Sequence, residues 1–170
     1  MTDHYTIRPA EKEDIKAILE IFNSARQYMR ANNNISQWVN GYPGKKDIEG
    51  DIDQGDCYVG EDHEGKIFMT FAFIIGNDPT YRVIKDGNWL NDNPYGTIHR
   101  IASNGRFSGV LEMACNFCFQ VIDNIRIDTH KDNLPMLKAL EKLGFEKCGI
   151  INCRDGSPRI AFQKVAECPL

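Results

Sequence analysis

Residues 97–118 read TIHRIASNGRFSGVLEMACNFC and combine two apolar runs with a short polar interruption. The apolar run at its start predicts a buried strand, and the longer apolar run at its end predicts a helix. Between the two runs lies a small cationic loop, residues 103–110, with the sequence SNGRFSGV. A strand that enters a helix through such a loop presents unpaired backbone N–H groups to an anion, and the helix adds partial positive charge. These residues fit a phosphate cradle and a plain strand-to-helix turn about equally well.

The individual residues of this loop suit a phosphate ligand. Gly105 and Gly109 allow a ligand to come close to the backbone and permit positive φ. Arg106 adds a cation whose guanidinium matches phosphate oxygens. The sequence contains neither the P-loop pattern G-x-x-x-x-G-K-[ST] nor the dinucleotide pattern G-x-G-x-x-G.

Length, charge and hydropathy limit the class of protein. A chain of 170 residues suits one domain with its own core, so we expect a single domain over residues 1–170. The net charge of −4 argues against a general nucleic-acid binder, whose surface would be basic. No run of about 18 apolar residues is present, so no membrane span is expected. Because the first residues lack an apolar signal-peptide core, we expect a cytoplasmic protein.

The six cysteines are expected to be reduced and to pack mostly in the core, where a free thiol behaves as a small hydrophobe. They are Cys57, Cys115, Cys118, Cys148, Cys153 and Cys168. Cys115 and Cys118 form a C-x-x-C pair, but they lie on an expected helix and have no second pair. Core packing is therefore favoured over a redox or zinc site, and no metal is expected.

Hydrophobic periodicity predicts a mixed α/β domain along the chain. Strands are expected at residues 5–10, 57–62, 66–76, 97–103, 124–130, 146–153 and 158–166. Helices are expected at residues 11–31, 45–55, 109–123 and 132–145. In the last helix, Asp132 is expected to cap the start, Pro135 falls in the first turn and Gly144 ends it. The polar insertion at residues 77–96 has a length that is often functional.

Three stretches, in order, resemble the GNAT superfamily of acetyl-CoA-dependent acyltransferases. The opening stretch resembles motif A, whose pattern Q/R-x-x-G-x-G/A is matched by Arg106 and Gly109, while Leu111 stands where the family prefers a small residue. Residues 126–149 resemble motif B, and residues 8–22 resemble the first strand and helix of the family. The resemblance implies a mixed, mostly antiparallel twisted sheet with splayed central strands, flanked by helices.

The resemblance implies acetyl-CoA as the cofactor and assigns residues to it. In the family, backbone N–H groups of the motif A loop hold the coenzyme A pyrophosphate, which here implies Arg106, Phe107, Ser108, Gly109, Val110 and Leu111. The edge of the fourth strand would pair with the pantetheine amides as an added strand does, through Ile101, Ala102 and Ser103. Asn133 would hydrogen-bond the pantetheine arm, and a helix-start role is the alternative.

The resemblance also implies the reaction, which is acetyl transfer from acetyl-CoA to a primary amine by direct attack in a ternary complex. His99 is the candidate base, since a histidine accepts protons near neutral pH; the alternative is a structural histidine on one sheet face. His130 is a weaker candidate that would otherwise hydrogen-bond its own loop, and Glu112 is expected at the surface. Many relatives carry a tyrosine acid where this chain has Leu140, so that role cannot be carried over.

Trp38, Tyr42 and Trp89 are aromatic residues in polar, irregular stretches and are expected to wall the acceptor pocket. The alternative is that they anchor long loops. The expected acceptor is a small-molecule amine or a peptide, with no nucleic-acid or membrane partner. Dimers are common for this fold, so a homodimer fits as well as a monomer. The competing function is a non-catalytic sensor that binds acyl-CoA, which Leu111 and Leu140 favour.

Overall fold

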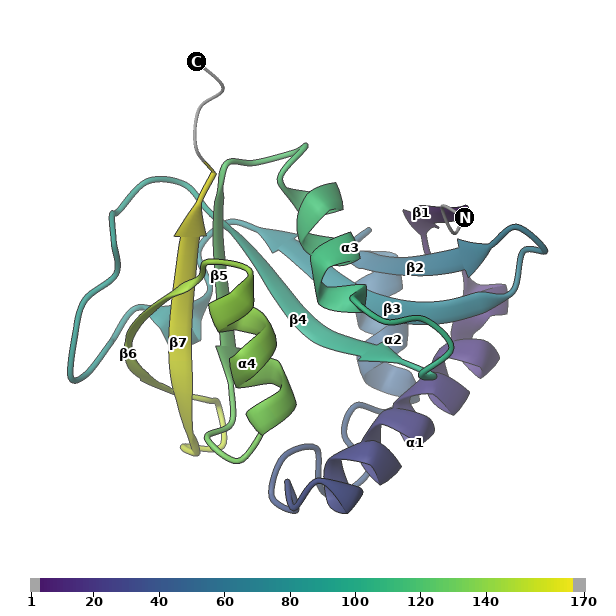
Figure 1. The fold of residues 1–170 in the computed structure, drawn as a ribbon, viewed down its shortest axis with the longest axis horizontal. Helices are drawn as coiled ribbons and strands as arrows, with labels where there is room; N and C mark the ends of the chain where they lie inside the picture. The colour runs from purple at the N-terminus through teal and green to yellow at the C-terminus, as the bar shows by residue number, and fades with distance from the viewer. Residues whose placement is uncertain (1–3, 167–170) are drawn as a thin grey trace. The chain divides into compact units, whose positions relative to one another are not determined.

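The computed structural model describes residues 4–166, which form seven strands and four α-helices (Figure 1). The elements follow in the order β1 (Tyr5–Pro9), α1 (Ile15–Ala31), α2 (Lys45–Asp53), β2 (Cys57–Asp62), β3 (Ile67–Ile75), β4 (Gly96–Ser103), α3 (Val110–Cys118), β5 (Asn124–Thr129), α4 (Leu134–Lys142), β6 (Glu146–Asn152) and β7 (Pro158–Val165). Two short 3₁₀ helices, η1 (Lys12–Asp14) and η2 (Pro79–Tyr81), precede α1 and lie between β3 and β4. The expected mixed α/β fold is confirmed. None of the helices in residues 4–166 is both long and apolar enough to cross a bilayer.

The strands are hydrogen-bonded in the order β1-β2-β3-β4-β5-β7-β6. The pairs β1–β2, β2–β3, β5–β7 and β6–β7 are antiparallel, whereas β4 and β5 are parallel. This parallel ladder is short, because it pairs only Gly96 with Ile125 and Thr97 with Arg126 among the described residues. The early end of the ladder is the splay that the fold class predicts.

The chain forms two compact units. Unit 1 contains the chain up to Phe73 together with Arg100–Ala114, and unit 2 contains Ile74–His99 together with the chain from Cys115. The boundary therefore falls inside β4, directly after His99. The candidate base and the candidate cofactor loop accordingly belong to different units.

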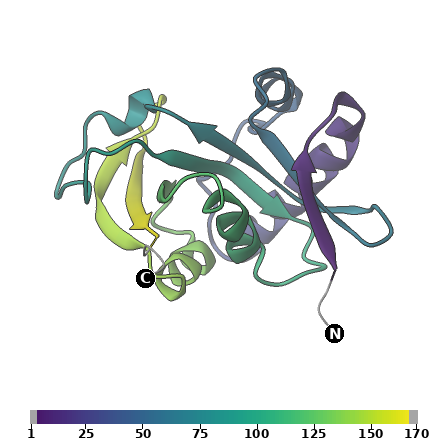
Figure 2. The same cartoon turned by 90° about the horizontal axis from the view of Figure 1, so that it is seen from above.

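Unit 1 has a core formed between the helices α1 and α2 and its strands. The apolar spacing predicted for the first helix is present in α1, where Ile18 and Phe22 are buried in one cluster with Ile48 of α2 and Val59 of β2. Figure 2 shows α1 and α2 on the same side of these strands. Burying each such side chain contributes about 1.5–3 kcal/mol, so this face holds the helices in place.

Unit 2 is built on β5, β6 and β7, with α4 lying across β5 and β7 (Figure 1). The predicted cap of α4 is wrong by one residue: Asn133, not Asp132, caps the helix through its side-chain oxygen. The Asn133 side-chain oxygen accepts the Met136 N–H at 3.3 Å, which is the bond of an N-cap, while the Asp132 backbone N–H donates to the ring of His130. Pro135 lies in the first turn and Gly144, with φ of +77°, follows the end, as predicted.

Helix α3 is shorter than the predicted helix at residues 109–123. It ends at Cys118, after which the Gln120 N–H donates to Phe117 O and the Val121 N–H to Cys118 O. Bonds to the residue three positions back are those of a 3₁₀ turn, which tightens and ends an α-helix. The sequence pattern stays apolar through this turn, so periodicity alone overextends the helix.

The insertion between β3 and β4 is fastened to β6 by backbone. Lys85 and Ile150 exchange both backbone hydrogen bonds at 2.8 Å. This approach needs a glycine beside it, because a Cβ at Gly149 would lie 2.5 Å from the carbonyl oxygen of Lys85, and φ there is +155°. The register of β6 against β7 also shifts at this glycine, and a glycine inside a strand often marks such an irregularity.

We expect Gly149→Ala to destabilise the protein by about 2 kcal/mol or more, because the new methyl group meets backbone at a φ that favours glycine. Gly50→Ala is the matched control, since Gly50 lies inside α2 and a Cβ there meets nothing within 4 Å. The control should gain about 0.5–1 kcal/mol, because glycine is a poor helix residue. Urea unfolding measures both, and a Gly149→Ala variant as stable as the wild type would contradict the tight contact.

Candidate functional site

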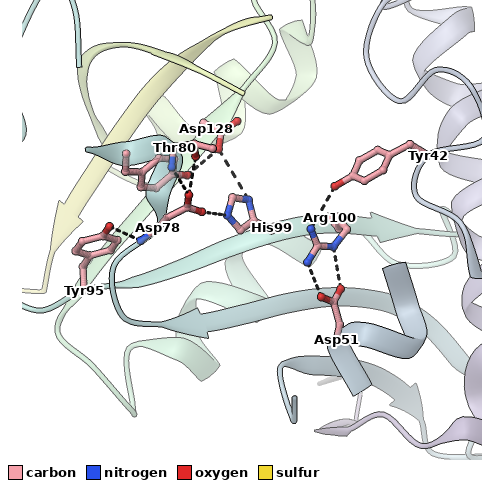
Figure 3. A network of polar contacts seen from close by, with 9 residues as sticks. Tyr42, Asp51, Asp78, Thr80, Tyr95, His99, Arg100 and Asp128 are labelled. Atoms are coloured by element: carbon pink, nitrogen blue, oxygen red, sulfur yellow. Dashed lines mark hydrogen bonds and ion pairs between the residues drawn. The ribbon is translucent and has the colours of Figure 1, made fainter. Parts of the chain in front are cut away.

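His99 lies two residues past the last ladder pair of β4, and each of its ring nitrogens faces a carboxylate of unit 2 (Figure 3). Its Nε2 is 2.8 Å from Oδ2 of Asp78, the residue before η2. Its Nδ1 is 3.9 Å from Oδ2 of Asp128 on β5. The His99 side chain keeps 20% of its surface exposed, so solvent reaches the ring.

Asp78 is fixed from several directions. Its backbone N–H donates to the Tyr95 hydroxyl at 2.9 Å, and its Oδ1 accepts from the Thr80 backbone N–H and hydroxyl at 2.8 and 2.7 Å. Partial burial raises the pKa of Asp78, but the hydrogen bonds from His99 and Thr80 outweigh it and hold this pKa well below its usual range. Asp78 is therefore ionised at neutral pH and only accepts hydrogen bonds.

Asp128 is held by a buried tyrosine. The Tyr81 hydroxyl donates to Asp128 Oδ2 at 2.7 Å, and Tyr81 itself is 2% exposed. Burial, followed by the charge of Asp128, raises the pKa of Tyr81 well above its usual value. The phenol stays protonated, so it keeps donating and fixes the carboxylate beside His99.

The loop between β4 and α3, in unit 1, presents backbone N–H groups. Gly105 and Gly109 have φ of +80° and +74°, as their predicted conformational role requires. The Gly105 N–H donates to the Ser103 hydroxyl and the Arg106 N–H to the Asn104 side chain. Within the described chain, the amides that follow have no hydrogen-bond partner, namely those of Phe107, Ser108, Gly109, Val110 and Leu111.

The Arg106 guanidinium lies in an ion pair. Its Nη2 is 2.7 Å from Oδ2 of Asp62, whose side chain is 1% exposed. Hydrogen bonds from the Lys66 backbone and from Arg106 outweigh burial and lower the pKa of Asp62. The cation that the loop was expected to offer a phosphate is thus paired, and the backbone amides are the groups left for an anion.

Arg100 follows His99 and carries the backbone of β4 into unit 1. Its φ of +51° is unusual for a strand residue and costs about 1–3 kcal/mol. Its guanidinium donates twice to Asp51 of α2, at 2.8 and 2.7 Å, and once to the Tyr42 hydroxyl (Figure 3). The residues predicted to pair with pantetheine come next; Ala102 is buried in the unit 1 core, and its neighbours Ile101 and Ser103 are half-buried.

Solved structures share this fold over nearly the whole chain. A crystal structure of a GNAT-family acetyltransferase from Streptococcus agalactiae is 33% identical, with a TM-score of 0.87 and 96% of each chain covered. The chain belongs to the GNAT family of acetyltransferases. A GNAT-family acetyltransferase from Listeria monocytogenes matches at 18% identity (TM-score 0.69, covering 97% of this chain and 98% of that one). A phosphinothricin acetyltransferase of the GNAT superfamily from Sinorhizobium meliloti, crystallised with AcCoA, matches at 16% (TM-score 0.62, covering 96% and 89%). No protein-family model and no curated protein matches the sequence.

Three GNAT motif positions have clear structural surroundings. Leu111, where the GNAT family prefers a small residue, is 5% exposed, so its side chain is accommodated in the protein interior. Asn133 is buried and caps α4, which was the alternative to a pantetheine contact; the contact itself stays a prediction. Leu140 is fully buried and offers no proton donor, in agreement with the gap noted from the sequence.

The aromatic residues expected to wall the acceptor pocket are fastened to their own units. Trp38 packs edge-on against Phe22, with ring centroids 5.4 Å apart. Trp89 donates from its indole N–H to a backbone carbonyl at 3.0 Å, and the Arg126 guanidinium lies 4.0 Å from its ring centroid. Tyr42 is 40% exposed, although its hydroxyl accepts a hydrogen bond from Arg100. The loop-anchor interpretation describes Trp38 and Trp89; contact with an acceptor stays a prediction for all three.

The remaining candidates have structural surroundings that agree with their alternatives. The His130 Nδ1 accepts the Asp132 backbone N–H at 3.1 Å, and burial, followed by the charge of Arg159, lowers the pKa of His130. Glu112 is exposed in the first turn of α3.

The cysteines in the described chain are free thiols. Cys115 and Cys118 are both buried, and burial raises the pKa of Cys118. Residues 4–166 contain no group of three or more side chains able to hold a metal ion. Cys168 lies outside the described residues.

The partners of His99 were not predicted from the sequence. Asp78 and Tyr81 lie in the insertion, which only its length singled out. Asp128 lies in β5, and its signal was available: a carboxylate next to an apolar strand residue, Ile127, needs a partner when half-buried. Nothing local in the sequence joins these residues to His99, because they meet only through the fold.

We expect Asp78→Asn to lower the free energy of unfolding at neutral pH, because the ionised carboxylate receives donors from His99 and Thr80. The folded pKa of Asp78 is lowered, so its contribution is present above the usual aspartate pKa of about 3.9 and is lost as pH falls through the folded value. The difference in the free energy of unfolding between wild type and variant should therefore become smaller below about pH 4. Urea unfolding from pH 3 to pH 7 tests this, with Thr80→Ser, which keeps the hydroxyl, following the wild type. A gap that widens on acidification would contradict the assignment.

Proposed function

We propose that this GNAT protein transfers an acetyl group from acetyl-CoA to a primary amine by direct attack in a ternary complex. The observation that carries the proposal is a histidine on β4, His99, tied through one ring nitrogen to the ionised Asp78. The other ring nitrogen can take a proton from the amine. General-base assistance of this kind contributes about 10²- to 10⁴-fold.

The loop of unit 1 fits the pyrophosphate of acetyl-CoA. The amides from Phe107 to Leu111 have no partner in the described chain, and a Cβ at Gly105 would meet nothing within 4 Å. Backbone amides at the start of a helix bind anions well, because their N–H groups point at the ligand and the helix dipole favours negative charge. By the family resemblance, Ile101–Ser103 would pair with the pantetheine amides and Asn133 with the arm. Acetyl-CoA supplies an activated acetyl group, whose C–S bond breaks with the electron pair leaving on sulfur.

Acetyl-CoA should stabilise the protein by about 2.7 kcal/mol at a hundred times its dissociation constant. Ser108→Glu places a carboxylate among the loop amides and should weaken acetyl-CoA binding at least about tenfold, because like charges repel in this loop. Ser36→Glu is the matched control, at an exposed serine of unit 1 outside the loop. Thermal shift and calorimetry measure both; equal weakening by the two variants would remove the loop from the site.

We expect His99→Gln to reduce acetyl transfer by about 10²-fold or more and to abolish the alkaline rise of the pH–rate profile, because no imidazole remains to accept the proton. Release of coenzyme thiol with a panel of primary amines measures the rate, and His4→Gln, at an exposed histidine, is the control. A pH profile unchanged in His99→Gln would rule out His99 as the base. Stabilisation by acetyl-CoA without thiol release from any amine would instead support the acyl-CoA sensor.

A further inference from the structure

The register of β4 against β5 places His99 and Asp128 opposite each other. The last ladder pair joins Thr97 to Arg126, and each strand then runs two residues further to His99 and Asp128. Because side chains alternate along a strand with a period of two, both residues point to the same face as the last pair. Both belong to unit 2, so the pair is formed within one compact body.

Asp78 fixes which nitrogen of His99 carries the hydrogen in the neutral ring. An ionised carboxylate only accepts hydrogen bonds, so Nε2, at 2.8 Å from Asp78, must donate. Nδ1 is then the nitrogen with the lone pair. Asp78 is itself held by Thr80 and Tyr95, so the choice of tautomer is built into the insertion.

The separation of Nδ1 from Asp128 Oδ2 suits a shared donor. At 3.9 Å the two atoms are too far apart for a direct hydrogen bond, but one nitrogen with two N–H groups can lie about 2.8 Å from each. Both are acceptors, and one is a carboxylate, so the chemistry asks for a cation with at least two N–H bonds. His99 and Asp128 keep 20% and 12% of their side chains exposed, so a small group can reach them.

We propose that the acceptor amine binds as an ammonium cation between His99 Nδ1 and Asp128 Oδ2, while Asp78 holds His99 in the tautomer that receives the proton. That the bound amine is the acetyl acceptor rests on the proposed function, whereas the ammonium site itself rests on the geometry. The site selects alkyl amines, which are cationic at neutral pH, over aromatic amines and alcohols. Asp78 is a positioning residue, and His99 and Asp128 touch the substrate.

The proton step follows from this placement. One N–H bond of the ammonium breaks, its electron pair stays on the amine nitrogen, and the proton moves to Nδ1. The positive charge moves from the substrate to the imidazole and stays beside the carboxylates of Asp78 and Asp128. The other titratable groups here are Tyr81, whose ring centroid lies 6.0 Å from that of His99, Tyr95, whose hydroxyl accepts the Asp78 backbone N–H, and Cys153, which lies near the charge of Asp128. Phenols and thiols are neutral in their ordinary protonated forms, so the negative charge here is that of Asp78 and Asp128.

The test uses the full chain labelled with ¹⁵N in histidine, without acetyl-CoA, so that it does not depend on turnover. His99 should give the signals of the Nε2–H tautomer, assigned by their loss in His99→Gln. Methylammonium chloride, titrated to about 0.1 M so that a dissociation constant of tens of millimolar is detected, should shift its Nδ1 signal. Tetramethylammonium, which has the charge but no N–H, should not. His130 is the internal reference, because its Nδ1 already accepts a backbone N–H.

Variants distinguish the role of Asp128 from that of Asp78. Asp128→Asn should weaken methylammonium binding at least about tenfold, and Asp128→Glu, which keeps the charge, should retain binding within about threefold. Asp132→Asn is the matched control, since it removes a carboxylate 3.5 Å from Nδ1 of a different histidine, His130, and should leave the His99 response unchanged. In Asp78→Asn, the two Thr80 donors hold the amide oxygen, so the NH₂ faces His99. The ring should switch to the Nδ1–H tautomer and lose its methylammonium response.

The outcomes are distinguishable from those of the proposed function. A His99 signal that ignores methylammonium, responds equally to tetramethylammonium, or is unaffected by Asp128→Asn overturns the ammonium site, even if amines are acetylated. A specific methylammonium response in a protein that acetylates no amine supports the site and rejects the enzyme. An unchanged tautomer in Asp78→Asn removes Asp78 as the positioning residue.

Discussion

The early end of the parallel ladder between β4 and β5 is the constraint on which the site depends. Paired strands lie about 4.8 Å apart, and side chains directly opposite each other would then pack in contact. Because the ladder stops at Thr97 and Arg126, the next residues on the same face, His99 and Asp128, keep 3.9 Å between their nearest polar atoms. That distance is too long for a direct hydrogen bond, and the proposed ammonium group would bind between the two atoms.

The insertion between β3 and β4 gives the strand histidine, His99, its closest carboxylate partner. It supplies Asp78 and Tyr81, and its anchors lie in the same unit: the Arg126 guanidinium lies 4.0 Å from the Trp89 ring centroid and 3.9 Å from that of Tyr95. Each such contact stabilises by about 0.5–2 kcal/mol, depending on burial. Trp89, which the sequence assigned to the acceptor pocket, thus holds in place the insertion that carries Asp78.

The sequence predicted the order of elements because each has a local cause. Apolar spacing defines α1, the loop glycines at residues 105 and 109 mark the start of α3, and Gly144 ends α4. Errors arose where two local signals compete, as when Asp132 and Asn133 both suit a cap and a ring nitrogen takes the amide of the first. His99 was singled out because it lies on β4 just before Ile101–Ser103, the residues that the family resemblance assigns to the cofactor.

The partners of His99 could not be predicted in the same way. Asp78 lies 21 residues before His99 in the chain, and register and chain reversal, not local pattern, bring the two together. The Arg106–Asp62 ion pair, across 44 residues, was missed for the same reason. A cationic loop residue reads as a free charge in the sequence, although the fold provides its counter-ion.

No tyrosine stands at the position of Leu140 to act as an acid, and the nearest tyrosine to His99 in unit 2 does not replace it. Tyr81 lies beside His99, but its hydroxyl donates to Asp128 and its pKa is raised by burial, so it holds its proton and cannot serve as an acid. An ordinary thiol has a pKa of about 8.5, so its thiolate leaves without strong acid assistance. In the proposed reaction, the harder task at neutral pH is to remove a proton from an alkyl ammonium. The two carboxylates beside His99, those of Asp78 and Asp128, would stabilise the positive charge during that step.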